Sequence, residues 1–127
     1  MIVRLPIRIS RGQNEREHWA VKAKRVKLER QGVCASLRSA FWQMNVLRGS
    51  CGWDTGRGEL PAVVTLTRIA PRFLDEDNLI GGLKGCRDGV ADALGIDDAD
   101  PRVTWRYAQA KGKPKEYALT IQIEERR

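Results

Sequence analysis

The apolar residues switch between strand-like and helix-like spacing along this chain, and the order of the switches is its strongest constraint on the fold. Residues 2–10 alternate between apolar and polar side chains, which predicts a half-buried strand. Pro6 has no amide proton to donate, so we expect this strand at the edge of a sheet. From about Glu15 to Leu47 the spacing becomes helical, and Gly32 is expected to bend or break that helix.

The second half of the chain predicts one more helix among three strands. Ala62–Ala70 is rich in β-branched residues, which favour a strand. Asn78–Leu94 has helical spacing and is followed by Gly95, a typical C-cap. Val103–Gln109 and Tyr117–Ile123 predict two strands joined by a basic hairpin loop. The order β-α-β-α-β-β predicts an α+β fold: a single domain over all 127 residues, with a mixed four-stranded sheet and two helices packed on it.

The composition favours an intracellular protein that binds phosphate-rich partners. The formal net charge is +7, and basic proteins are attracted to polyanions. No stretch of 18 apolar residues predicts a membrane helix, and the N-terminus lacks the apolar block of a signal peptide, so we expect no membrane partner and a cytoplasmic location. The three cysteines are widely spaced and His18 is the single histidine, which argues against a disulfide framework or a zinc site. We expect Cys86 to be a small core residue.

The predicted second helix has two distinct faces. Its apolar arc would pack on the core and consists of Leu79, Leu83, Cys86, Val90, Ala93 and Leu94. The opposite arc is polar and small, and its simplest interpretation is a solvated surface: Asp77, Gly81, Lys84, Gly85, Asp88 and Asp92.

Three features of this helix suggest more than a solvated surface. Its four glycines each weaken a helix, so close approach of another backbone or of a phosphate should compensate. Lys84 lies seven residues after Asp77, about two turns along the same face, and could reach back toward it. Asp88, four residues after Lys84, could pair with the lysine and hold it.

Six of the 16 acids lie in two short clusters, Asp75-Glu76-Asp77-Asn78 and Asp97-Asp98-Ala99-Asp100. Carboxylates this close repel one another unless a cation lies among them, and a divalent ion with oxygen ligands is the usual solution. In an extended segment Asp75 and Asp77 would point to one side, with Cα atoms about 6.5–7 Å apart, while Asn78 caps the helix. We predict Asp98 as the third metal ligand. Asp97 could replace it, and Asp100, before a proline, favours an Asx-type turn.

The ordered set of these residues resembles the RusA family of Holliday-junction resolvases, which includes many phage and prophage members. The matching pattern is Asp75-Glu76-Asp77-Asn78-Leu79, then Lys84, then Asp88-Gly89-Val90, then Leu94-Gly95-Ile96-Asp97-Asp98. The resemblance covers about residues 62–124.

This resemblance implies a homodimeric, magnesium-dependent endonuclease, with manganese as a substitute ion, that cuts four-way DNA junctions and takes part in DNA recombination and repair. It implies Asp75, Asp77 and Asp98 as metal ligands and Lys84 as the essential lysine. The gap between Asp77 and Lys84 is about one helical turn longer than in the best-known member. That difference motivates a second hypothesis, a non-catalytic nucleic-acid-binding protein. A nuclease for other branched or single-stranded DNA is a third.

The basic residues of the first helix and of the last hairpin are the predicted DNA contacts. Phosphate binding by several of them would be strongly salt-dependent, although a solvated face remains the alternative for each residue. The residues are Arg16, Lys22, Lys24, Arg25 and Lys27, followed by Lys111, Lys113 and Lys115. Trp19, Trp105 and Tyr107 are expected to pack in the core.

Overall fold

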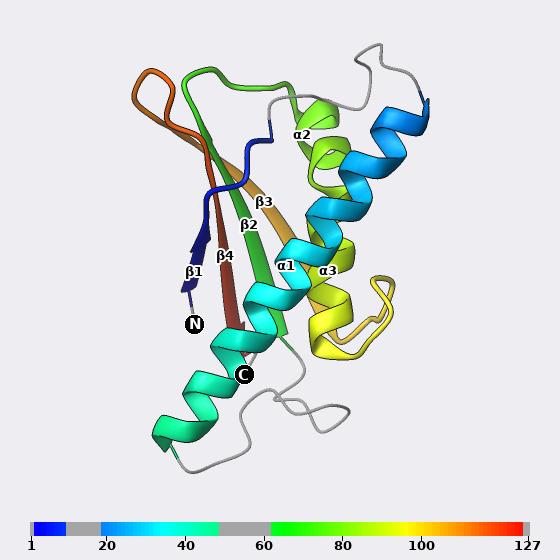
Figure 1. Ribbon diagram of the computed structural model, residues 1–127, viewed down its shortest axis with the longest axis vertical. Helices are drawn as coiled ribbons and strands as arrows, with labels where there is room; N and C mark the ends of the chain where they lie inside the picture. Colours follow the sequence, from blue (N-terminus) through cyan, green and yellow to red (C-terminus); the bar gives the residue numbers. More distant parts are fainter. Residues whose placement is uncertain (1, 10–18, 49–61, 126–127) are drawn as a thin grey trace.

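The structure is a computed structural model, and it describes residues 2–9, 19–48 and 62–125, without the side chains of 44–48 and 125. One sheet carries the helices along one of its faces (Figure 1). The elements in chain order are β1 (Ile2–Leu5), α1 (Trp19–Arg48), β2 (Ala62–Ala70), α2 (Glu76–Gly82), α3 (Lys84–Leu94), β3 (Val103–Lys111) and β4 (Ala118–Glu125).

The sheet has four strands in the order β1-β4-β2-β3. The pairs β1–β4 and β2–β4 are antiparallel, whereas β2–β3 is parallel. A parallel pair needs a crossover connection, and α2 and α3 supply it. The mixed four-stranded sheet and the α+β class are therefore confirmed. So is the edge position of β1, while β3 forms the opposite edge.

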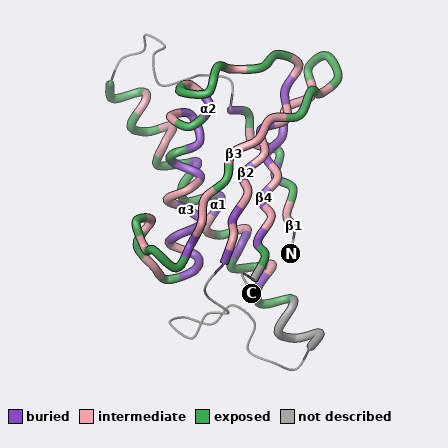
Figure 2. The backbone as a smooth tube through the Cα atoms, turned by 180° about the vertical axis from the view of Figure 1, so that it is seen from behind, coloured by how far each residue is buried: buried purple, intermediate pink, exposed green. Residues whose placement is uncertain are grey.

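The core lies between the helices and the sheet face that they cover. Strand β2 alternates strictly between buried and half-buried residues along its whole length, as a strand with one covered face should (Figure 2). Its bounds are those that the sequence predicts. On β2, the covered side also holds one polar residue, Arg68, at 4% exposure.

Helix α1 differs from the prediction in two respects. It runs without interruption through Gly32, so a break at that position is wrong. Val33, Leu37 and Phe41 are buried on its inner stripe, as their spacing predicts. Trp19, however, is 77% exposed, so its predicted core role is wrong. The reason is its position at the first residue of α1, well before the part of the helix that packs on the core.

The predicted second helix is two helices. Leu83 has φ −93° and ψ 0° and stands between α2 and α3, directly after two low-propensity glycines. Every member of the predicted apolar arc is nevertheless buried. Gly95, at φ 72°, ends α3 as the predicted C-cap.

Two glycines of α3 lie directly against α1. A Cβ atom added at Gly85 would stand 3.0 Å from Val26 Cγ1, and one added at Gly89 would stand 2.5 Å from the carbonyl oxygen of Arg30. The close approach of another backbone, predicted from the glycine content, is therefore confirmed for these two positions. The polar arc of the helix is consequently only partly solvated.

Candidate functional site

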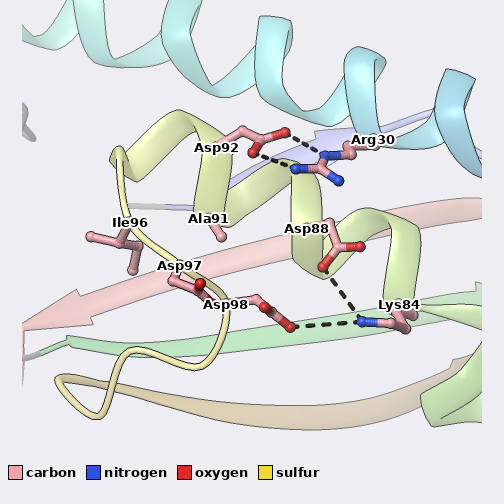
Figure 3. A pocket seen from close by; sticks show the side chains of 8 residues that line it. All are labelled: Arg30, Lys84, Asp88, Ala91, Asp92, Ile96, Asp97 and Asp98. Atoms are coloured by element: carbon pink, nitrogen blue, oxygen red, sulfur yellow. Dashed lines mark hydrogen bonds and ion pairs between the residues drawn. The ribbon is translucent and has the colours of Figure 1, made fainter.

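An open pocket of about 360 Å³ lies where α3, the turn after it and α1 meet. Figure 3 shows acidic and basic side chains converging on it from these segments. The lining residues are Arg30, Lys84, Asp88, Ala91, Asp92, Ile96, Asp97 and Asp98. The pocket thus contains two of the four predicted catalytic residues, Lys84 and Asp98.

The ammonium group of Lys84 lies between two carboxylates. Its Nζ is 3.7 Å from Asp88 Oδ1 and 3.7 Å from Asp98 Oδ2. The pairing with Asp88, predicted from the four-residue spacing, is confirmed. The Lys84 side chain is 67% exposed, whereas those of Asp88 and Asp98 are 19% and 32% exposed. The carboxylates therefore form the wall of the pocket, and the ammonium group remains open to a ligand.

Arg87 holds the segment that carries Asp98, a role that sequence reasoning missed. Its Nη2 donates to the carbonyl oxygen of Asp98 at 2.8 Å, its Nη1 donates to the Tyr107 hydroxyl at 2.9 Å, and its guanidinium carbon lies 4.8 Å from the centre of the Trp105 ring. Trp105 Nε1 donates to the same Asp98 carbonyl oxygen at 3.0 Å. Both aromatic residues pack against the core, as predicted, and their polar atoms fix the Asp98 turn as well. Arg87 stands three residues after Lys84 on α3, which is the one signal that could have marked it.

A second ion pair closes the pocket on the α1 side. Arg30 donates to both carboxylate oxygens of Asp92, at 2.6 and 2.8 Å. These hydrogen bonds hold the pKa of Asp92 below its ordinary value. The fork-like geometry ties α1 to α3 at a fixed distance.

The other two aspartates of the second cluster are used locally. Asp97 accepts a hydrogen bond from the Ala99 amide at 2.9 Å, which lowers the pKa of its carboxyl. Asp100 accepts from the amide and the guanidinium of Arg102, and these bonds lower its pKa to about 2. The Asx-type turn predicted at Asp100 is confirmed. Within this cluster, it is Asp98 whose carboxylate approaches Lys84.

The first acidic cluster lies at the start of α2 and differs from the prediction. Asp75, not Asn78, is the N-cap, and its Oδ1 accepts from the Asn78 amide at 3.0 Å. Asp77 lies in the first turn of α2, so the extended geometry expected for Asp75 and Asp77 is wrong. Lys84 begins α3, so the expected reach along one shared helix face is wrong too. Neither Asp75 nor Asp77 lines the pocket of Lys84 and Asp98.

The carboxylates of the pocket are chemically suited to magnesium. Magnesium takes hard oxygen ligands and needs only one or two protein carboxylates, since water and phosphate complete its octahedron. Asp88, Asp97 and Asp98 supply such oxygens from the pocket wall. In the part of the chain that the structure describes, however, no three His, Cys, Asp or Glu side chains form a group that could hold a metal ion by themselves.

The predicted DNA contacts lie on two separate elements. Lys24 and Lys27 are exposed on α1, and Lys22 is half-buried there. Arg25 is half-buried and pairs with Glu29 at 3.1 Å, which indicates a structural role. The hairpin residues Lys111, Lys113 and Lys115 are exposed, at the end of β3 opposite the Asp98 turn (Figure 1). Arg16 lies outside the described residues.

A comparison with known proteins shows a similarity to a bacterial protein. No protein-family model matches the chain. It is 38% identical over 85 residues to an uncharacterized protein of the bacterium Xylella fastidiosa, and the match covers 67% of this chain. The chain spans about half of that relative, 51% of its length. Among the described residues, no helix has the length and apolarity needed to cross a membrane.

Proposed function

We propose that this protein is a magnesium-dependent endonuclease that resolves four-way DNA junctions. The observation that carries the proposal is the ammonium group of Lys84 held between Asp88 and Asp98 in an open pocket of a basic chain. Such a pocket combines oxygen ligands for a divalent ion with a cation for a phosphate, which is what phosphodiester hydrolysis requires. The order of the acidic residues and the lysine, with its resemblance to RusA-type resolvases, selects the junction as substrate.

Each residue of the proposed site has a separate task. Bound magnesium would polarise the scissile phosphate and lower the pKa of a bound water. Asp98 would supply a carboxylate ligand from the pocket. The resemblance adds Asp75 and Asp77, which lie at the start of α2 outside that pocket. Lys84 would stabilise the negative charge that develops on the phosphate, because its ammonium group is exposed while two carboxylates hold it in place. Arg87 would keep the Asp98 turn in position through the Asp98 carbonyl oxygen.

DNA binding would use the exposed lysines of α1 and of the β3–β4 hairpin. Neutralising several phosphates releases counterions, so the affinity should fall steeply with salt. A cytoplasmic protein of a bacterium or a phage fits this role.

The proposal includes a homodimer, because paired cuts need two active sites. Val21, Leu28 and Trp42 are large apolar side chains of α1 that are 58%, 59% and 67% exposed, and the smaller Ala35 continues their seven-residue spacing. A seven-residue repeat keeps these apolar side chains close to one line along the exposed side of α1, where a second copy of the helix would pack. Sedimentation velocity should give about twice the 14.3 kDa chain mass for the wild type and the monomer mass for Leu28→Lys. A wild-type monomer at all concentrations would remove the dimer from the proposal.

The decisive experiment is a cleavage panel of four-way, forked, duplex and single-stranded DNA with magnesium or manganese. Asp75→Asn removes the carboxylate charge but keeps the N-cap of α2, since asparagine also caps helices. Asp98→Asn and Lys84→Met remove the other proposed groups. Asp100→Asn is the matched control, because it makes the same change in the same turn at a residue bonded to Arg102. We expect the first three variants to lose junction cleavage and the control to keep it; cleavage retained by Asp75→Asn would refute the proposed role.

A second candidate function is a DNA-binding protein without catalysis. It is favoured by the separation of Asp75 and Asp77 from the pocket that holds Asp98 and Lys84. This candidate predicts salt-sensitive binding to DNA and no cleavage of any substrate with either ion. Preferential cleavage of forks or single strands would instead identify a nuclease of another specificity.

A further inference from the structure

The residue before Asp75 is fixed by a side chain from the far end of β3. Gln109 Oε1 accepts a hydrogen bond from the Leu74 amide at 2.8 Å, and Gln109 Nε2 donates to the Leu74 carbonyl oxygen at 2.7 Å. One side-chain amide thus satisfies both backbone groups of Leu74, as a neighbouring strand would. The two residues are 35 positions apart in sequence, so only the fold brings them together.

A buried arginine supports the same segment. Arg68 donates to the carbonyl oxygen of Arg72 at 2.6 Å and lies 3.4 Å from Gln109 Oε1, and it also donates to the carbonyl oxygen of Ile9. Burial lowers the pKa of its guanidinium. Burying a charge is costly unless hydrogen bonds compensate. The bond to Arg72 holds the loop between β2 and α2, and the contact with Gln109 Oε1 orients the Gln109 amide, whose oxygen faces the arginine.

Strand β3 carries anchors for both acidic clusters on one face. Trp105, Tyr107 and Gln109 alternate along β3 and point to the same side. Trp105 bonds the Asp98 carbonyl oxygen, Tyr107 bonds Arg87, and Gln109 bonds Leu74. Trp105 and Gln109 are four positions apart along β3, about 13 Å. The strand therefore fixes the distance between the segments that carry Asp75 and Asp98.

We propose that Gln109 is a positioning residue for Asp75 and Asp77, acting through the backbone of Leu74. The inference rests on the proposed function, because only that function makes these aspartates metal ligands. Its physical basis is that Asp75 follows Leu74 directly and caps α2, so a fixed Leu74 backbone fixes the start of α2 and the direction of the Asp75 carboxylate. Groups that orient metal ligands typically change metal affinity or activity 10- to 100-fold when removed.

The test uses Gln109→Met, which keeps the side-chain length and removes both hydrogen bonds. The matched control is Gln122→Met on β4, the same change at a partly exposed glutamine that donates to Glu124. Gln109→Glu is the conservative variant, because a carboxylate still accepts from Leu74 but cannot donate back. We expect the magnesium concentration for half-maximal junction cleavage to rise about 10-fold in Gln109→Met. It should rise less in Gln109→Glu and not at all in the control, with the KM for DNA unchanged throughout.

A second measurement separates this inference from the proposed function. Amide NMR spectra of the full chain, titrated with Mn²⁺ alone, report line broadening at Asp75 and Asp77 whether or not DNA is cut. Broadening that needs about 10-fold more Mn²⁺ in Gln109→Met than in the control supports the inference. Equal titrations in the two variants, or no broadening in the wild type, overturn it. If the wild type cuts no DNA while the variants still differ in the Mn²⁺ titration, only the proposed function is refuted.

Discussion

The contact between α1 and α3 can be tested by adding a single methyl group at two glycines. At Gly89 an added Cβ would stand 2.5 Å from the carbonyl oxygen of Arg30 and 2.9 Å from Val33 Cβ. Neither atom belongs to the free end of a flexible side chain, so α1 itself would have to move. At Gly32, on the exposed side of α1, an added Cβ would meet no atom within 4 Å. Gly32→Ala is therefore the matched control for Gly89→Ala.

The two substitutions share one contribution to the free energy of unfolding and differ in a second one. Replacing glycine with alanine inside a helix stabilises it by about 0.5–1 kcal/mol, and this gain applies to both variants. Overpacking a close contact costs about 1–3 kcal/mol, and this cost applies only at Gly89. We therefore expect Gly32→Ala to stabilise the protein by about 0.5–1 kcal/mol and Gly89→Ala to destabilise it by about 0.5–2 kcal/mol.

Urea unfolding followed by far-ultraviolet circular dichroism at pH 7 would measure both values. The slopes of the unfolding lines should agree among the variants, so that the midpoints report stability. For a chain of this length, 1 kcal/mol corresponds to a shift of roughly 3–5 °C in Tm, which gives an independent check. A Gly89→Ala protein as stable as Gly32→Ala would refute the close approach of the two helices.

Three further predictions concern caps, charges and a thiol. Asp75→Ala should cost about 1 kcal/mol in urea unfolding through loss of the α2 N-cap, and Asp75→Asn should cost less because asparagine also caps; equal losses would contradict the cap. Arg30 lowers the pKa of Asp92 below 3.8, so the ion pair contributes stability that is complete above about pH 4 and is lost as the pH falls through the lowered pKa. The stability difference between wild type and Arg30→Met should therefore be less than about 1 kcal/mol at pH 7, since the pair is largely solvent-exposed, and should shrink toward pH 2.5; a difference that grows in acid would count against the pair. Burial raises the pKa of the Cys86 thiol to about 12, so iodoacetamide at pH 8 should leave Cys86 unmodified in the native protein and alkylate it in urea, as peptide mass spectrometry would show; rapid native alkylation would show that Cys86 is accessible.

Much of the fold follows from local patterns in the sequence. Strand β2 has the predicted bounds because β-branched residues and a following proline mark both its nature and its end. Gly95 ends α3 as predicted, because a residue at positive φ favours glycine. The break at Leu83 was not predicted, because neighbouring glycines weaken a helix but do not determine the residue at which it ends. Exposure of Trp19 was missed because periodicity gives the face of a helix but not how far along it the core extends.

In the candidate site, too, some contacts could be predicted from the sequence and others could not. The pairing of Lys84 with Asp88 was predictable, because residues four apart on a helix are neighbours. Arg87 and the Asp98 carbonyl oxygen are 11 residues apart, and Leu74 and Gln109 are 35 apart. No periodic pattern connects such pairs, so these contacts could be found only in the folded chain.

The sequence by itself determined the α+β class, the order of the strands, the apolar arc of the segment that forms α2 and α3, and the acidic and basic residues on which the proposed chemistry rests. These properties depend on local spacing and residue type, which the chain carries before it folds. Only the tertiary structure decided that Asp98 meets Lys84, that Asp75 caps α2 outside their pocket, and that β3 anchors both acidic segments. Those contacts depend on the packing of distant segments, because hydrogen bonds and ion pairs act over only a few ångströms.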